Sequence, residues 1–181
     1  EYQAHRRCAV GLIFCKEVTM ANVKLSTKAV GSIVKIKVNG EAKDFIIVHQ
    51  GKPSSIYDDS CDGTWVLLKD IYTTRTFGSN NSYKASSIHS YLNGAFYNLI
   101  DSEIRANIKQ VKIPYQDGTG NSGSLATGAN GLSAKVFLLS GYEVGWTTVD
   151  YDGLPKDGAR LEYFLDGSNT DAKNRRIAYN N

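Results

Sequence analysis

The stretch that decides the fold is "SIVKIKVNGEAKDFIIVHQ", residues 32–50. Its first part, "SIVKIKV", alternates apolar residues with lysine, which is typical of a strand with one buried face. Asn39-Gly40 follows, and this dipeptide is the strongest short hairpin signal because a type I′ turn needs positive φ at both central residues. "DFIIVHQ" then returns as the second strand. The sequence therefore predicts an antiparallel hairpin.

A helix is predicted further along the chain, in "SSIHSYLNGAFYNLI", with Ser86 or Ser87 as its N-cap. Apolar residues three or four positions apart form its buried stripe: Ile88, Tyr91, Leu92, Phe96 and Leu99. A second short helix, "SEIRANI", is capped by Asp101 or Ser102. Strands are predicted at "WVLLK", "QVKIPY" and "AKVFLLS", and a short helix at 159–164. The fold class is therefore α+β, and it is rich in loops.

Length and composition indicate a single globular domain. The chain has 181 residues, of which 41% are hydrophobic and 22% charged, and no apolar run approaches the roughly 18 residues of a membrane-spanning helix. A net charge of +3 is too small to indicate a nucleic-acid partner. We therefore expect neither a membrane span nor nucleic-acid binding.

The first 19 residues differ in character from the rest. "KEVTM", residues 16–20, can be back-translated as AAG GAG GTN ACN ATG, a purine-rich ribosome-binding site before a start codon. Residues 1–19 are accordingly predicted to be a translated upstream leader or a disordered arm, and 20–181 the domain. The alternative is a degenerate secretory signal, because Arg6 and Arg7 precede "AVGLIF". Cys61 is then the domain's only cysteine, which fits synthesis in a reducing cytoplasm.

The candidate motifs for catalysis and metal binding in this sequence are incomplete. "DYDGLPKDG" resembles a calcium loop, but counting from Asp150 places Gly153 fourth and Leu161 twelfth, where an EF-hand needs Gly sixth and Glu twelfth. His49 and His89 lack clustered metal ligands, and we expect both to be structural. Cys61 would need a partnered base to act as a nucleophile. No cofactor, metal or catalytic residue is predicted.

Aromatic residues in loops are the best candidates for binding. Tyr and Trp give large contact areas at small entropic cost, and loops on a rigid scaffold carry most binding sites. The alternative is that some of them fill the core; we expect this of Trp65 and Trp146, although Trp146 stays a candidate. The predicted recognition loops are 72–85, 116–131 and 146–158. The predicted ligand-binding residues are Tyr72, Tyr83, Trp146, Tyr151 and Asp152.

Four phrases in this order carry a family resemblance: "IHSYLNGAFYNLI", "SEIRANIKQVKIPY", "KVFLLSGYEV" and "NRRIAYNN". Over about residues 32–181 the chain resembles an uncharacterised domain family, a domain of unknown function, of gut bacteria and their phages. That family looks related to the C-type-lectin-like fold that formylglycine-generating enzymes share. In such domains a Trp-rich segment follows the "IAYNN" region and completes the sheet. This resemblance implies that the C-terminal strands are missing here.

The resemblance implies a non-catalytic recognition or structural module, phage- or prophage-encoded and associated with a tail or virion. Its expected partners are a host-surface glycan or protein, or other virion proteins. It would be cytoplasmic when synthesised and virion-associated later. The alternative is an enzyme, or a degenerate enzyme, related to formylglycine-generating enzymes. Those enzymes use a pair of cysteines late in the domain, whereas Cys61 is alone and early.

Overall fold

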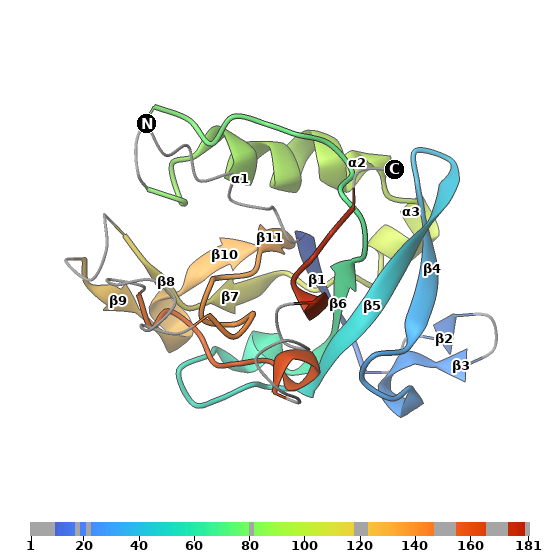
Figure 1. Ribbon diagram of the computed structural model, residues 1–181, viewed down its shortest axis with the longest axis horizontal. Helices are drawn as coiled ribbons and strands as arrows, with labels where there is room; N and C mark the ends of the chain where they lie inside the picture. Colours follow the sequence, from blue (N-terminus) through green and yellow to red (C-terminus); the bar gives the residue numbers. More distant parts are fainter. Residues whose placement is uncertain are drawn as a thin grey trace.

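The computed structural model describes residues 10–16, 19–20, 23–79, 82–117, 123–146, 155–165 and 174–179. Its main feature is an antiparallel five-stranded sheet in the order β11–β1–β6–β5–β4 (Figure 1). Short helices and long connections surround this sheet, so the structure is mixed and compatible with the predicted α+β class. The five strands are β1 (Val10–Phe14), β4 (Ile33–Val38), β5 (Glu41–Gly51), β6 (Gly63–Leu68) and β11 (Val136–Leu138).

The predicted hairpin at residues 32–50 is confirmed. Strands β4 and β5 pair in register from Ile33↔Ile46 to Val38↔Glu41, and only Asn39 and Gly40 separate them. Both turn residues have positive φ, 53° at Asn39 and 79° at Gly40, as a type I′ turn requires. The hairpin therefore depends on the Asn39-Gly40 turn, as predicted from the sequence.

Strand β1 lies inside the segment for which a leader or arm is predicted. Leu12, Ile13 and Phe14 are fully buried. Leu12 pairs with Val66 of β6 on one side and with Val136 of β11 on the other. At residues 10–14 the structure thus differs from that prediction, because this short apolar run fills both faces of the sheet between two neighbours. Where translation begins stays a prediction.

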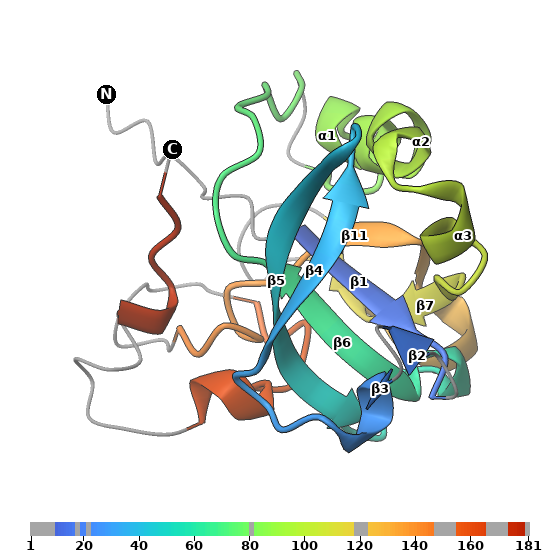
Figure 2. The ribbon, with the colours of Figure 1, turned by 90° about the vertical axis from the view of Figure 1, so that its right-hand side faces the viewer.

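One face of the sheet carries a layer of helix (Figure 2). α1 (Ser87–Tyr91), a π-helical stretch (Leu92–Phe96) and α2 (Tyr97–Leu99) follow one another without a break, and α3 (Ser102–Arg105) comes next. Ser86 caps α1 by accepting from the His89 N–H, and Asp101 caps α3 by accepting from the Glu103 N–H. The predicted helices are confirmed at residues 87–99 and 102–105, whereas the short helix predicted at 159–164 is a 3-10 turn at Glu162–Phe164. Among the described residues, no helix has the length and apolar character needed to cross a bilayer.

The opposite face is covered by the later part of the chain (Figure 2). Leu161 and Phe164 are fully buried there against strand residues such as Trp65 and Phe137. The remaining short strands are β2 (Thr19–Met20), β3 (Val23–Lys24), β7 (Val111–Ile113), β8 (Tyr115–Gln116), β9 (Leu125–Ala126) and β10 (Leu132–Ala134). The 3-10 turns are η1 (Leu25–Thr27), η2 (Asp59–Cys61), η4 (Gly128–Asn130) and η5 (Glu162–Phe164).

Side chains close the outer edge of β11. The Asn93 side chain, from the π-helical stretch, accepts from the Lys135 N–H at 2.7 Å and donates to the Val136 carbonyl at 2.9 Å. The Tyr83 hydroxyl accepts from the Leu138 N–H at 2.9 Å. Since an edge strand otherwise presents unpaired backbone groups, these two residues take the place of a neighbouring strand. The strand predicted at "AKVFLLS" is thus present as an edge strand, and its Val136 and Phe137 side chains are fully buried.

A chain that starts at Met20 lacks β1 and should not fold cooperatively. Its absence would leave facing edges of β6 and β11 unpaired and both layers without the buried side chains of residues 10–14. Thermal unfolding monitored by circular dichroism compares the full chain with residues 20–181. Equal melting temperatures would show that β1 is dispensable.

Asn93→Ala should destabilise the protein by about 1–3 kcal/mol, because it leaves backbone groups of β11 without a partner. Asn98→Ala is the matched control: Asn98 lies on the same helical segment but is exposed, and accepts only from Arg105. Urea unfolding measures both. Similar losses in the two variants would contradict the capping role of Asn93.

Candidate functional site

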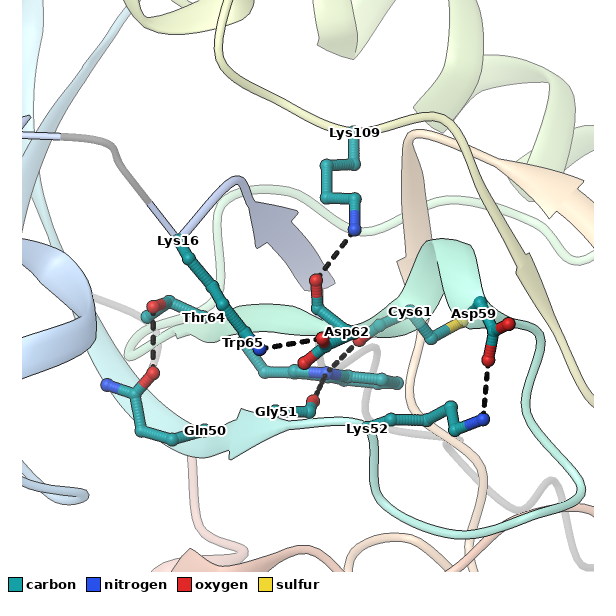
Figure 3. A network of polar contacts seen from close by, with 10 residues as sticks. All are labelled: Lys16, Gln50, Gly51, Lys52, Asp59, Cys61, Asp62, Thr64, Trp65 and Lys109. Atoms are coloured by element: carbon teal, nitrogen blue, oxygen red, sulfur yellow. Dashed lines mark hydrogen bonds and ion pairs between the residues drawn. The ribbon is translucent and has the colours of Figure 1, made fainter.

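Trp65 anchors the face of the sheet opposite the helices. It lies on β6, is 1% exposed, and its indole N–H lies 3.0 Å from the carbonyl oxygens of both Gly51 and Cys61 (Figure 3). The rings of Tyr57 and Phe137 meet it edge-on, each with centroids 5.6 Å away. One buried side chain thereby fixes the loop 51–61 relative to the sheet. The core position expected for Trp65 is confirmed.

Charged groups around η2 hold this loop from outside (Figure 3). Lys52 pairs with Asp59 at 2.6 Å, and Lys16 pairs with Asp62 at 2.6 Å. Lys109 donates to the Asp62 carbonyl at 2.7 Å. These groups are largely exposed, and exposed ion pairs contribute about 0–1 kcal/mol each. Within the described residues, no group of His, Cys, Asp and Glu is arranged to hold a metal ion.

Tyr57 and Glu143 form a buried hydrogen bond that joins three segments. The Tyr57 hydroxyl donates to Glu143 Oε1 at 2.6 Å and accepts from the Ala159 N–H at 2.9 Å. Glu143 Oε2 accepts from the Ser140 N–H at 2.8 Å. A Cβ added at Gly158 would lie 2.5 Å from Glu143 Cγ, so a glycine is needed for this close approach. The contact therefore ties loop 51–61 to turn 140–146 and to segment 158–161.

Burial changes the ionisation of this pair. Glu143 is 3% exposed, and desolvation raises its pKa to about 8, against the opposing effect of hydrogen bonds from Tyr57 and Ser140. Desolvation and the adjacent Glu143 charge also raise the pKa of Tyr57. Perturbed acids are common at active sites, but structural networks perturb pKa values as well. Here the pair is sealed inside the protein and holds segments together.

Cys61 is sealed in the same core. It is fully buried, and its Sγ lies 3.3 Å from the Lys112 carbonyl. Desolvation raises the pKa of the thiol to about 12, so the thiolate needed for nucleophilic attack is scarce at neutral pH. This environment is typical of an inert structural cysteine.

The two histidines in the described part of the chain, His49 and His89, also have structural surroundings. His49 on β5 is 8% exposed, and its Nδ1 lies 3.1 Å from Glu162 Oε1 without the alignment of a hydrogen bond. Burial lowers the pKa of His49, which the Glu162 charge only partly offsets. Burial likewise lowers the pKa of the half-buried His89, which lies beside Asn93. Neither ring is paired with a nucleophile.

An open groove lies where the C-terminal segments cross the sheet face. Its volume is about 410 Å³, within the usual range for ligand sites, and it has both polar and apolar walls. Buried Leu161 and Phe164 hold η5 in place, and the Leu161 N–H donates to the Glu143 carbonyl at 3.0 Å. The lining residues are Val30, Gly31, Glu162, Tyr163, Leu165 and Arg175.

The groove combines an aromatic ring with one charge of each sign. Arg175 Nη1 donates to the Tyr163 carbonyl at 2.7 Å, and its guanidinium carbon lies 5.3 Å from the centre of the Tyr163 ring. Glu162 is 42% exposed on the same wall, and Leu165 is 56% exposed. Such a surface can bind a small polar group by ring contact, charge and hydrogen bonding. None of these residues is a predicted site residue.

The predicted binding residues do not gather at the groove. Tyr72 packs on the helix layer with its ring 5.2 Å from that of Phe96, and Tyr83 caps β11. Trp146 is 42% exposed, so a core position for it was wrong, and it does not line the groove. Tyr151 and Asp152 lie outside the described residues.

Sequence reasoning missed the groove residues for an identifiable reason. In the sequence, Arg175 stands beside Arg176 in a short basic cluster typical of a solvated turn, and Glu162 and Tyr163 lie in an ordinary amphipathic turn. Glu143 gave a better signal, because an acid between Tyr142 and Val144 in "GYEVGW" is unusual for an exposed turn. No local pattern in the sequence brings residues 30–31 together with Glu162, Tyr163, Leu165 and Arg175.

One protein-family model matches the chain, over residues 62–181, with the description "Domain of unknown function (DUF6273)". The matched span is more than half of the chain. The chain belongs to this family. Strands β1, β4 and β5 precede the DUF6273 match, whereas β6, the helices and η5 lie within it. Searches of curated proteins and of solved structures found no match.

The expected membership in an uncharacterised domain family is thereby confirmed. Its occurrence in gut bacteria and phages, and its relation to C-type lectins, stay predictions. For the DUF6273 match itself, every lining residue of the groove except Val30 and Gly31 falls inside the matched span.

The buried acid gives a test of the Tyr57–Glu143 contact. The folded pKa of about 8 lies above the ordinary value of 4.5, so folding retains a proton that the unfolded chain releases. The stability from this group is therefore complete below pH 4.5 and is lost as pH rises to about 8, at about 1.4 kcal/mol per pH unit. Glu143→Gln, whose amide oxygen can still accept from the Tyr57 hydroxyl, should remove this loss and be more stable than the original protein at pH 8.

Urea unfolding between pH 5 and pH 9 measures the difference. Glu103→Gln, at an exposed position on α3, is the control and should leave the pH dependence as it is in the original protein. If Glu143→Gln shows the same decline with pH as the original protein, Glu143 does not carry a retained proton.

Proposed function

We propose that this DUF6273 domain is a non-catalytic recognition module that binds a group on a host surface, from a glycan or a protein. This proposal depends on which side chains are buried and which are exposed. The acid and thiol with strongly raised pKa values, Glu143 and Cys61, are sealed in the core, whereas Tyr163, Arg175 and Glu162 face an open groove. A groove of this kind offers contacts for binding.

The groove sits on a rigid base, which supports a binding role. Its η5 wall is held by buried Leu161 and Phe164 and through Glu143 by Tyr57. A binding surface that is ordered before the ligand arrives loses less conformational entropy on binding. Gly31 borders the Tyr163 ring, and its φ of +89° is a backbone conformation that favours glycine.

The enzymatic alternative, a relative of formylglycine-generating enzymes, gains no support from Cys61. A catalytic cysteine must form a thiolate and be reached by substrate. Cys61 is fully buried with a raised pKa, and Cys15, the other described cysteine, is exposed on the segment after β1.

We further propose a phage or prophage setting, in which the module belongs to a tail or another virion-associated structure. This part rests on the four phrases that resemble the phage-borne domain family. Such a protein would be made in the cytoplasm and carried on the particle. Immunogold labelling of purified virions tests it directly, and a particle without label would remove the tail assignment.

Binding through the groove can be tested with a matched pair of arginines. Arg175 and Arg105 each lie near a tyrosine ring and each donate one side-chain hydrogen bond, but only Arg175 lines the groove. On an array of bacterial surface glycans and in pull-downs of host envelope proteins, the original protein should give a defined hit. The affinity for that hit, measured by titration, should fall roughly ten-fold with Arg175→Ala, which corresponds to about 1.4 kcal/mol. The affinity should be unchanged with Arg105→Ala.

Circular dichroism and melting temperature confirm that both variants stay folded. A hit that both variants bind equally well would move the binding site away from the groove. The absence of any hit, together with absence from virions, would overturn the recognition proposal.

A further inference from the structure

The two edges of the central sheet are treated differently. At the β11 edge, Asn93 and Tyr83 satisfy the outward backbone groups. At the β4 edge the chain provides a partner only near the hairpin, where the Asn39 N–H donates to the Leu99 carbonyl and the Asp101 N–H donates to the Lys37 carbonyl. After Asp101 the chain turns away into α3. The rest of β4 lies at the outside of the sheet (Figure 1).

The register identifies which backbone groups of β4 face outward. Antiparallel pairing alternates, so residues 34, 36 and 38 direct their N–H and C=O toward β5, as does Ser32, whose carbonyl accepts from the Ile47 N–H. Ile33 and Lys35 therefore direct theirs to the open side. Among the residues that the structure describes, no hydrogen-bond partner reaches the outward groups of these two.

The side chains on this edge indicate what could pair with it. Ile33 is 46% exposed, and the Lys35 side chain is 69% exposed and pairs with Asp44 at 2.7 Å on the inner side. Lys37 is also exposed. A second copy of the chain would bring lysine against lysine, which is destabilising between directly opposed residues. An acidic strand would instead place a carboxylate opposite Lys35.

We propose that the open edge of β4, at Ile33 and Lys35, is an addition site for an extended acidic segment of a partner protein. The segment pairs antiparallel as a sixth strand, in line with residues 99–101, which already run antiparallel along the same edge. Main-chain hydrogen bonds to Ile33 and Lys35 provide the attachment. An acid opposite Lys35 provides the selectivity. This assignment goes beyond the groove and does not depend on it.

The probe is a fluorescein-labelled peptide of alternating Glu and Val, added to the full chain and followed by fluorescence anisotropy. Saturable binding is expected, and a peptide of alternating Lys and Val should not bind. In the expected register the glutamates face Lys35 in hydrogen-bonded pairs. N-methylation of the glutamates should therefore abolish binding, whereas N-methylation of the valines, whose N–H groups face away, should not.

Charge reversal supplies the second arm. Lys35→Glu should lower the affinity for the acidic peptide about five-fold, because a like-charge pair replaces an opposite-charge pair. It should also allow the lysine peptide to bind, because the opposed pair then has opposite charges. Lys84→Glu, at an exposed lysine before α1, is the control and should not change the binding of either peptide. Arg175→Ala, in the groove, should also leave both unchanged.

Absence of binding by the acidic peptide would overturn the proposal. So would binding that survives N-methylation of the glutamates, since that would be attraction between charges without strand pairing. An effect of Arg175→Ala equal to that of Lys35→Glu would place the peptide in the groove. Melting temperatures of the variants show whether a lost signal reflects unfolding.

Discussion

The hydrogen bond between the Tyr57 hydroxyl and the Glu143 carboxyl group is the contact on which the arrangement of the loops depends. It joins segments 86 positions apart, and through the Ala159 N–H it includes a third. The Glu143 backbone carbonyl then accepts from Leu161, immediately before η5. Loops usually lie at the surface because their polar groups need partners. Here one buried acid and one buried tyrosine supply those partners, so the loops can pack as a second layer.

This layer of packed loops explains why the groups with perturbed pKa values are buried whereas the groove residues are exposed. Burying Glu143 has an energetic cost, which appears as its raised pKa, and the bonds from Tyr57 and Ser140 offset part of that cost. In return η5 is fixed, and Tyr163 and Arg175 can form a groove wall. The groups that titrate unusually therefore stabilise the fold, whereas the exposed groove groups are the ones placed to meet a ligand. A mobile layer of low stability could not keep Glu143 buried while holding the groove residues at the surface.

Local signals could predict local structure in this chain, and they could not predict its edges or its groove. The Asn39-Gly40 turn, the Ser86 cap and the Asp101 cap were predictable because each depends on residues a few positions apart. Strand β1 was missed because residues 1–19 were interpreted as a leader or arm, and "VGLIF", buried on both faces, shows no strand period of two that would have opposed this interpretation. Tyr83 was taken for a binding residue because it sits among polar neighbours. Its hydroxyl instead meets Leu138, 55 positions away, a contact that no window of sequence contains.

The two edges of the sheet differ in how their backbone groups are protected. An unpaired strand edge invites association, and proteins commonly close it with side chains or protect it with lysine. The β11 edge uses the first device, through Asn93 and Tyr83, and no further strand can pair there unless both move. The β4 edge uses the second, through Lys35 and Lys37, which repel a second copy while leaving the backbone groups accessible. Protection by charge is selective in sign, so lysines that disfavour pairing with a second copy would favour pairing with an acidic strand.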